Sequence, residues 1–299
     1  MTLVEFNEKY GTEAQCAQHL YDTRWPEGFV CPRCFHNEHF DVKSRELYQC
    51  KSCKYQASVT AGTIMDKTRT PLKKWFLAFY LMSQDKRGIS ALSLKGKIGV
   101  SYNTAWTMCQ KIRHVMGERD KSYQLGGTVE LDEAFFGAPT EGGKRGRGTD
   151  KTVVFVSISL TEEGKPQYAK MKVVKPEANE AVDSEIVKKF ADESIAKGSN
   201  IRTDGLNIYN KLPENGYNHE PKEYDPINQP EHLHWTHIII SNVKALIQGT
   251  FHGLESLHLQ RYLNEFCYRF NRRWLKSVFT NLVSACALSN KITYHELIG

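Results

Sequence analysis

Two pairs of cysteines most constrain what this chain can fold into. Cys31-Pro-Arg-Cys34 and Cys50-Lys-Ser-Cys53 each enclose two residues, and fifteen residues separate the pairs. This spacing is typical of a zinc site with four thiolate ligands. Each bend directs two sulfurs to one point, and two bends complete the tetrahedron that zinc prefers. Residues 39–48 can form a hairpin between the bends, so the sequence predicts an N-terminal zinc ribbon that needs its metal to fold.

Disulfide bonds are the main alternative use of these cysteines. They require an oxidising compartment, and residues 1–21 are polar and lack the apolar core of a signal peptide. The sequence also has no run of eighteen apolar residues that would predict a membrane span. We therefore expect a cytoplasmic protein with a structural zinc ion. The remaining cysteines are then reduced core thiols in helix-like sequence: Cys16, Cys109, Cys267 and Cys286.

Positive charge is concentrated in the middle of the chain. Residues 66–121 contain twelve Lys and Arg but four Asp and Glu, a balance of +8, whereas the whole chain has a net charge of +6. A basic segment beside a zinc ribbon predicts a polyanionic partner such as nucleic acid. A solvated basic helix surface would give the same composition.

A second basic segment lies at residues 141–148. It combines four glycines with three cations and cannot pack a core, so it predicts a loop between two strands. Contact with phosphate and simple solvation are both open for its cations, which are Lys144, Arg145 and Arg147.

The basic middle also predicts a helix-turn-helix. Residues 88–95 favour a short helix, Gly99-Val-Ser breaks it, and Ser101 can cap a second helix that continues through Val115. Lys111 and Arg113 add charge to this second helix. A plain helical hairpin is the alternative. If the unit binds DNA, the side chains at the start of the second helix reach base edges or phosphates: Tyr102, Asn103, Thr104 and Thr107.

The C-terminal half predicts strands that carry carboxylates. Residues 128–137 alternate as a strand does, with Glu130 and Asp132 on one face. Two apolar strands follow at 151–160 and 167–174, and a short strand at 200–204 ends in Asp204. The expected helices are 176–197, 232–251, 257–270 and 274–288.

This order of elements is that of a ribonuclease-H-like fold, in which acids of the first and fourth strands meet at the centre of the sheet. We therefore expect Asp132 and Asp204 to share divalent ions, because converging carboxylates repel one another without cations. Two Mg²⁺ or Mn²⁺ ions about 3.5–4 Å apart serve phosphodiester chemistry. Each acid also has a local alternative: a strand-end turn for Asp132 and a helix cap for Asp204.

The third ligand is ambiguous, because residues 232–254 contain no carboxylate. His237 is our first choice and Asn242 the second; a purely structural polar role for both residues is the alternative. His237 and Lys244 are seven residues apart and share one side of a helix, whereas Asn242 lies on another side. An imidazole ligand shifts the preference towards Mn²⁺, and Lys244 becomes a candidate for holding a substrate phosphate.

At these residues the chain resembles the ISXO2-like transposases of bacterial insertion sequences. The resemblance covers most of the chain, and its motifs are specific only in combination. They are Cys31–Cys34, Ser58–Thr63, Pro71–Phe76, Val100–Trp106, Val129–Glu133, Thr203–Gly205, Ser241–Lys244, Gly249–Gly253, Gln260–Phe266 and Arg269–Arg272.

The resemblance implies a DDE-class transposase. Asp132 and Asp204 match the two aspartates of the family, and Lys244 matches its lysine. Many relatives carry Glu seven residues before that lysine, where this chain has His237; others have an Asn in the motif, which leaves Asn242 open. The implied reaction is hydrolysis at the element ends to free a 3′-OH, followed by attack of that hydroxyl on target DNA.

The implied partners are double-stranded DNA, both the terminal inverted repeats and the target, and at least one further copy of the chain. The implied location is the bacterial cytoplasm, in association with the nucleoid.

The sequence thus predicts a multidomain α+β protein. A zinc ribbon occupies residues 1–62, a helix-turn-helix domain 63–122, and a ribonuclease-H-like α/β catalytic domain 123–299. Two other functions stay open. One is a sequence-specific DNA-binding regulator with an inactive transposase-like domain, which the missing third acid favours. The other is a ribonuclease-H-like nuclease without strand transfer.

Overall fold

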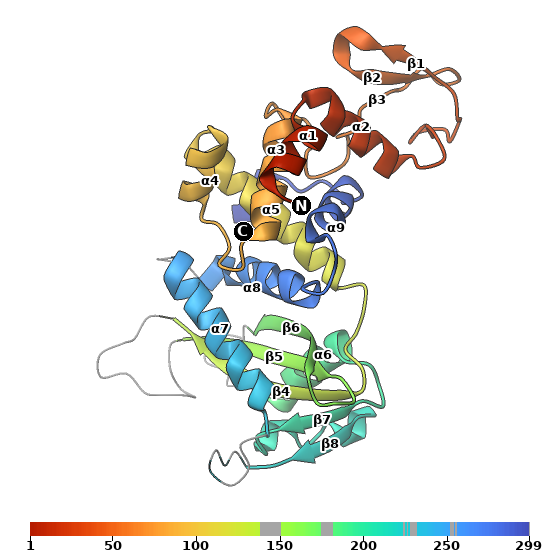
Figure 1. Cartoon of the computed structure of the whole chain (residues 1–299). Helices are drawn as coiled ribbons and strands as arrows, with labels where there is room; N and C mark the ends of the chain where they lie inside the picture. The colour runs from red at the N-terminus through yellow and green to blue at the C-terminus, as the bar shows by residue number, and fades with distance from the viewer. Residues whose placement is uncertain are drawn as a thin grey trace. The chain divides into compact units, whose positions relative to one another are not determined.

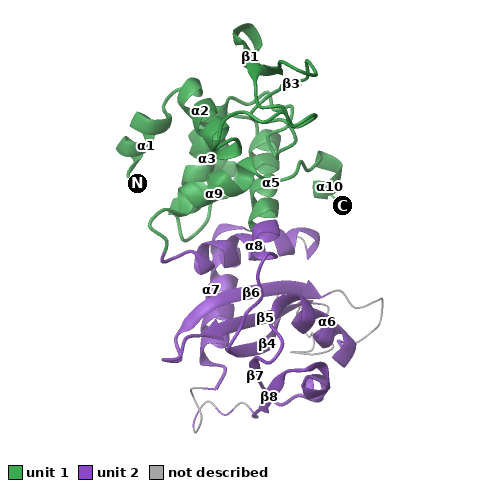
Figure 2. Ribbon diagram, turned by 90° about the vertical axis from the view of Figure 1, so that its right-hand side faces the viewer, with its two compact units in different colours: residues 1–116, 275–299 green, residues 117–274 purple. Residues whose placement is uncertain are grey.

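The chain forms two compact units. The computed structural model describes residues 1–137, 151–174, 182–223, 225, 227, 232–251, 254 and 256–298. Unit 1 comprises residues 1–116 and 275–299, and unit 2 comprises residues 117–274 (Figure 2). Among the described helices, none combines the length and the apolar character needed to cross a membrane.

Unit 1 begins with two short helices and the zinc ribbon. Both helices start with a capping box, in which a threonine and a residue three positions later satisfy each other's backbone N–H groups. The ribbon is a three-stranded antiparallel sheet that contains the predicted hairpin. The elements are α1 (Leu3–Tyr10), α2 (Glu13–Arg24), β1 (His39–Val42), β2 (Leu47–Cys50) and β3 (Gln56–Ala57).

The C-terminal helices of the chain belong to unit 1. The ring of Phe279 in α9 lies 5.2 Å from that of Tyr10 and 5.8 Å from that of Phe6, between centroids. Helix α9 also packs against α3 (Figure 1). We expected residues 275–299 in the C-terminal domain. The structure places them in unit 1, because their aromatic side chains share a core with the N-terminal helices. The helices are α3 (Leu72–Gln84), α4 (Ala91–Ile98), α5 (Tyr102–Asp120), α9 (Val278–Ala287) and α10 (Tyr294–Ile298).

Helices α4 and α5 flank the turn predicted at Gly99. Gly99 ends α4 in the left-handed region, at φ 61°, where a residue without Cβ has no steric penalty. The Oγ of Ser101 accepts the N–H of Thr104 at 3.2 Å and so caps the start of α5. The two helices and the turn are present; their use in binding DNA stays a prediction.

Unit 2 is built on a five-stranded sheet in the order β6-β5-β4-β7-β8. The first three strands form an antiparallel meander, and β7 and β8 run parallel to β4. The strand β8 was not predicted, because its four residues lack apolar alternation and it lies at an edge. The strands are β4 (Thr128–Phe136), β5 (Thr152–Leu160), β6 (Pro166–Val174), β7 (Asn200–Thr203) and β8 (Asn218–Pro221).

Each face of this sheet has its own core. Val129 and Leu131 of β4 pack with α6 (Ser184–Ser194). The alternate residues Ala134 and Phe136 pack with α7 (His234–Thr250) and α8 (Ser256–Asn271). Strand alternation puts Glu130 and Asp132 on the α7 face as well.

A buried ion pair joins the ends of α5 and α8 within unit 2. Arg272 Nη1 donates to Asp120 Oδ1 at 2.7 Å, and Asn271 Nδ2 donates to Asp120 Oδ2 at 3.1 Å. Burial raises the pKa of Asp120, and Arg272 opposes this rise. The guanidinium also lies 3.7 Å from the centroid of the Tyr268 ring. Removing one partner would leave the other charge buried and unpaired.

We expect Arg272→Met to lower the free energy of unfolding of unit 2 by about 3–5 kcal/mol, because Asp120 would keep its desolvation penalty without its cation. The matched control is Lys172→Met, which removes the exposed Lys172–Glu193 pair and should change the stability by about 0–1 kcal/mol. Urea unfolding measures both. Equal losses in the two variants would show that the buried pair has no special role.

Candidate functional site

The four cysteine sulfurs of the ribbon lie together. Cys31 Sγ is 3.6 Å from Cys53 Sγ, and Cys34 Sγ is 3.5 Å from Cys50 Sγ. Within the described ranges, this is the one group of three or more His, Cys, Asp or Glu residues with ligand atoms all within 4.8 Å of one another. The convergence of four sulfurs fits the tetrahedral geometry of zinc.

The two Cys-x2-Cys bends share one backbone geometry. The N–H of Phe35 donates to the carbonyl of Cys31 at 2.9 Å, and the N–H of Lys54 donates to that of Cys50 at 3.1 Å. Both donors have left-handed backbones, with φ of 62° for Phe35 and 59° for Lys54. This conformation is uncommon for residues other than glycine.

The backbone of the bends also favours thiolates. Desolvation raises the pKa of Cys31, but hydrogen bonds from the N–H groups of Arg33 and Cys34 lower it by more, to about 7. Hydrogen bonding from the N–H of Cys53 likewise lowers the pKa of Cys50 against desolvation. The N–H of Tyr55 lowers the pKa of Cys53, but desolvation and hydrogen bonds with the other three cysteines raise it, to about 11. Thiolates are the form that binds a metal, so the backbone of the bends and the four converging sulfurs fit the structural zinc ion that the sequence predicts.

We expect one zinc ion per purified chain, and its loss in the double variant Cys31→Ser/Cys34→Ser. Cys16→Ser is the control: this buried thiol of α2 lies outside the group of four sulfurs, so zinc should be retained. Elemental analysis of the purified chains measures both. Zinc retained in the double variant would rule out the four-thiolate site.

The carboxylate site of unit 2 is formed by neighbouring strands. Asp132 lies in β4, and Asp204 directly follows β7. The paired residues of these parallel strands end at Glu130 and Arg202, and Asp132 and Asp204 each follow that pair by two residues in the same strand direction. Neighbouring strands are about 4.8 Å apart. Asp132 Oδ1 accepts the N–H of Glu133 at 2.7 Å, and Asp204 Oδ1 accepts that of Leu206 at 3.2 Å.

Helix α7 brings His237 to this site. His237 Nε2 lies 3.3 Å from Asp132 Oδ2. Burial and the nearby Lys151 lower the pKa of Lys244, and Asp132 raises it in part, so Lys244 faces β4 too. Asn242 is exposed on a different side of the helix. The ligand atoms of Asp132, Asp204 and His237 do not all come within 4.8 Å of one another.

Glu130 fixes the start of α7. Its side chain is 1% exposed, and its Oε2 accepts the N–H of Thr236 at 2.8 Å and the hydroxyl at 2.9 Å. The residue before the helix, Leu233, provides no side-chain cap, so a carboxylate from β4 fills that role at the positive end of the helix dipole. Sequence reasoning placed Glu130 on the correct face but gave it no role. The sequence did carry one signal for this role: Leu233 cannot cap the helix that follows it, so another residue has to accept the first N–H groups of α7.

Two histidines hold the residue before Asp204. His232 Nε2 donates to the carbonyl of Thr203 at 2.7 Å, and His219 Nε2 lies 2.9 Å from the hydroxyl of Thr203. Thr203 is fully buried, and burial lowers the pKa of His219. The position of Asp204 therefore depends on β8 and on the start of α7. No spacing in the sequence relates these residues, so the sequence could not reveal them.

The predicted DNA-binding residues of α5 differ in exposure. Tyr102 and Asn103 are exposed, whereas Thr104 and Thr107 are half-buried. Lys111 Nζ donates to the carbonyl of Ile64 at 2.8 Å, and burial lowers its pKa. Its ammonium group is thus engaged within unit 1.

Arg113, which we expected to add charge to the second helix, does not present that charge at the surface. Arg113 is 1% exposed and donates to the carbonyl of Ile89 at 3.3 Å. The apolar periodicity of α5 did not predict the burial of Arg113. A long cationic side chain can be buried where a backbone carbonyl accepts its hydrogen bond, and the sequence does not show such a partner. The loop at 141–148, with Lys144, Arg145 and Arg147, lies outside the described residues.

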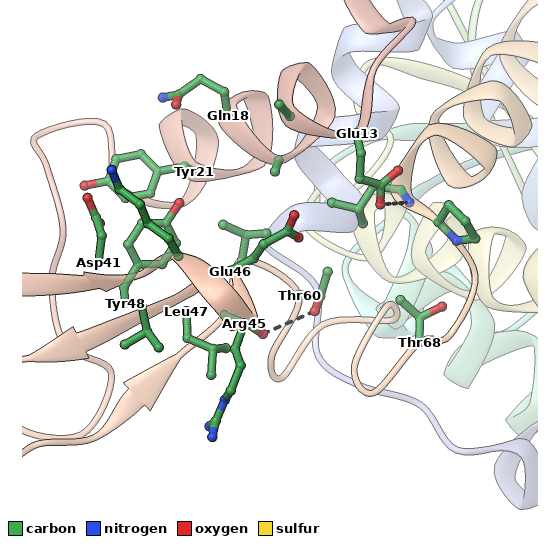
Figure 3. A pocket seen from close by; sticks show the side chains of 18 of the residues that line it. Glu13, Gln18, Tyr21, Asp41, Arg45, Glu46, Leu47, Tyr48, Thr60 and Thr68 are labelled. Atoms are coloured by element: carbon green, nitrogen blue, oxygen red, sulfur yellow. Dashed lines mark hydrogen bonds between the residues drawn. The ribbon is translucent and has the colours of Figure 1, made fainter.

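A cavity of about 1090 Å³ lies between α2 and the β1–β2 hairpin (Figure 3). At its edge, Glu13 accepts the N–H groups of Leu72 at 2.5 Å and Lys73 at 3.1 Å, and so caps α3. The cations and carboxylates of the lining are equal in number, so the cavity lacks the net positive charge of a polyanion site. These residues are Lys43, Arg45, Arg69, Glu13, Asp41 and Glu46.

Two family models match the ranges of the chain that contain these residues. The family model of the ISXO2-like transposase domain matches residues 124–271, which include Asp132, Asp204 and α7. The model of the transposase zinc-ribbon domain matches residues 11–56, which include all four cysteines of the ribbon. An uncharacterized protein in the transposable element ISH50 of Halobacterium salinarum is 29% identical over 221 residues, which cover 68% of this chain and 71% of that protein.

Proposed function

Because this chain belongs to the ISXO2-like transposases, we propose that it is an insertion-sequence transposase that binds the ends of its element and catalyses DNA cleavage and strand transfer. The observation that carries this proposal is the 3.3 Å contact between His237 Nε2 and Asp132 Oδ2. Asp132 lies in β4, and Asp204 directly follows the neighbouring strand β7. An acid on each of two neighbouring strands, with a histidine from a helix, is a donor set for divalent cations.

The order of the sheet supports a ribonuclease-H-like core. Three antiparallel strands are followed by two that run parallel to the first. The acids then lie on the central strand β4 and at the end of its neighbour β7. Ligands in open α/β sheets commonly bind at the carboxyl ends of such parallel strands.

We infer that Asp132, Asp204 and His237 hold two Mg²⁺ or Mn²⁺ ions. Carboxylate oxygens suit both, and the imidazole favours Mn²⁺. Bound there, the ions would activate the attacking oxygen and stabilise the leaving one. In the first step water oxygen bonds to phosphorus as the bond to the 3′ oxygen breaks. In the second step, that 3′ oxygen bonds to a phosphorus atom of the target strand as the bond from this phosphorus to the target's own 3′ oxygen breaks, which leaves a free 3′-OH on the target.

The other residues of the site bind and orient. Lys244 lies on the α7 side that faces β4 and is partly desolvated, which strengthens its attraction to a phosphate oxygen. Glu130 holds the start of α7 against the strand that carries Asp132. His232 holds the backbone directly before Asp204. These contacts preorganise the donor set before DNA arrives.

DNA binding is assigned to unit 1 and to the glycine-rich loop. The start of α5 offers Tyr102 and Asn103 at the surface, with Thr104 and Thr107 beside them. Lys144, Arg145 and Arg147 are further phosphate contacts in this proposal. Two element ends must meet in one complex, which requires at least two copies of the chain.

A DNA-binding regulator with an inactive domain is the second candidate. One observation favours it: α7 carries no carboxylate along its whole length, so the third ligand is not an acid. A nuclease without strand transfer fits less well, because the N-terminal ribbon and the α4–α5 pair are suited to holding duplex DNA.

We expect Asp132→Asn and Asp204→Asn each to abolish cleavage and joining of a plasmid that carries the repeats flanking this gene, because an amide binds divalent ions weakly. Binding to the repeats, measured by gel shift, should survive. The control Glu162→Gln, at an exposed turn, should keep full activity. Normal cleavage by either Asn variant would disprove the two-ion assignment. Wild-type protein that binds but never cuts would favour the regulator.

For the third ligand, we expect His237→Ala to stop cleavage and the exposed variant Asn242→Ala to retain it. His237→Glu should restore cleavage and shift the preference from Mn²⁺ to Mg²⁺, because a carboxylate replaces the imidazole. Cleavage in each metal measures all three. Loss of cleavage in Asn242→Ala alone would reverse the ranking of the two candidates.

A further inference from the structure

We propose that the outer face of the zinc ribbon binds DNA at a step where the bases are unstacked. The ribbon face comprises Phe40, Lys51 and Lys54, which lie together, and we include with it Phe35, an exposed residue of the first bend. The inference rests on the proposed function and names the part of the DNA-binding arm that would touch bases.

One side of the ribbon is covered and the other is open. The ring of His39 lies 4.7 Å from that of Phe29 and 5.1 Å from that of Tyr48, between centroids. Tyr48 in turn packs on Tyr21 of α2. Successive residues of a strand point to opposite faces, so Phe40 points away from α2, and it is 53% exposed.

Phe35 is held in a conformation that does not favour it. Its φ of 62° is left-handed, a region where a Cβ clashes with the backbone and glycine is preferred. Its side chain is 79% exposed, so no burial of the ring offsets this strain. Lys54 has the same left-handed backbone in the second bend, so the bend sets this conformation and leaves the Phe35 ring at the surface, where a partner can reach it.

The cations of the ribbon face lie beside an aromatic ring. Lys51 Nζ and Lys54 Nζ are 5.4 Å and 5.8 Å from the centroid of the Phe40 ring. Lys54 Nζ also donates to the carbonyl of Lys51 at 2.8 Å, which holds the two ammonium groups on the same side. Glu38 lies 3.6 Å from Lys51 Nζ and offsets part of this charge.

Exposed aromatic rings among lysines are suited to nucleic acid. Phenyl rings stack on bases, and ammonium groups contact phosphates. An intact duplex hides the faces of its bases, so the ring of Phe35 can stack on a base where a step is kinked or a base is displaced.

The test measures binding by fluorescence anisotropy, with the full chain and two labelled probes: a duplex of random sequence and the same duplex with a short central bulge. Wild-type protein should bind the bulged probe more tightly. Phe35→Gly should lose about tenfold in affinity for that probe. It should keep its zinc and its thermal stability, because glycine adopts the left-handed backbone without strain. Phe35→Tyr, which keeps the ring, should bind as wild type.

Two further variants separate backbone and charge effects. Glu46→Gly relaxes another left-handed residue of the hairpin, at φ 51°, and should not weaken binding. Lys51→Ala/Lys54→Ala should weaken binding to both probes alike. It should also reduce the magnitude of the slope of log affinity against log salt concentration by roughly two, since each phosphate contact contributes about 0.9 to that slope.

Unchanged affinity of Phe35→Gly, or equal affinity of the wild type for the two probes, would overturn the inference and leave the proposed function intact. A wild-type chain that binds neither probe would contradict the proposed function and the inference together.

Discussion

The arrangement of unit 2 depends on one buried carboxylate. Glu130 accepts two hydrogen bonds from Thr236 at the start of α7, and so joins a helix that lacks its own cap to the central strand. Because Asp132 follows two residues later on the same face and His237 follows Thr236 directly, this anchor sets the contact between those two side chains. A single strand thus carries both the anchor and the proposed ligand.

Unit 1 uses the same device. The residue before α3 is Pro71, which provides no side-chain cap, and Glu13 of α2 accepts the first N–H groups of that helix instead. In both units a carboxylate from another element completes a helix terminus. Such a contact fixes a helix end to a sheet or to another helix, which local capping by a neighbouring residue does not do. It thereby orients the helix as well as satisfying its backbone.

The sequence allowed the ribbon and most of the strands to be predicted, because cysteine spacing and apolar alternation are local signals. It did not predict β8, whose residues 218–221 have no alternation. The pattern of α9 shows an apolar face but not its partner, so the return of residues 275–299 to unit 1 was missed. Arg113 and Lys111 have buried hydrogen-bond partners that lie far away in the sequence. The roles of Glu130 and His232 likewise depend on tertiary neighbours, although Asp132, Asp204 and His237 were selected by their order and spacing.

Asp132, Asp204 and His237 are proposed to hold divalent ions together. Anomalous diffraction from crystals of the full chain soaked in Mn²⁺ tests this most directly, since it locates the ion without any assay of DNA. We expect anomalous peaks within coordination distance of the carboxylates of Asp132 and Asp204 and of His237 Nε2, and we expect these peaks to be absent in Asp132→Asn. Peaks found elsewhere alone, or unchanged in that variant, would contradict it.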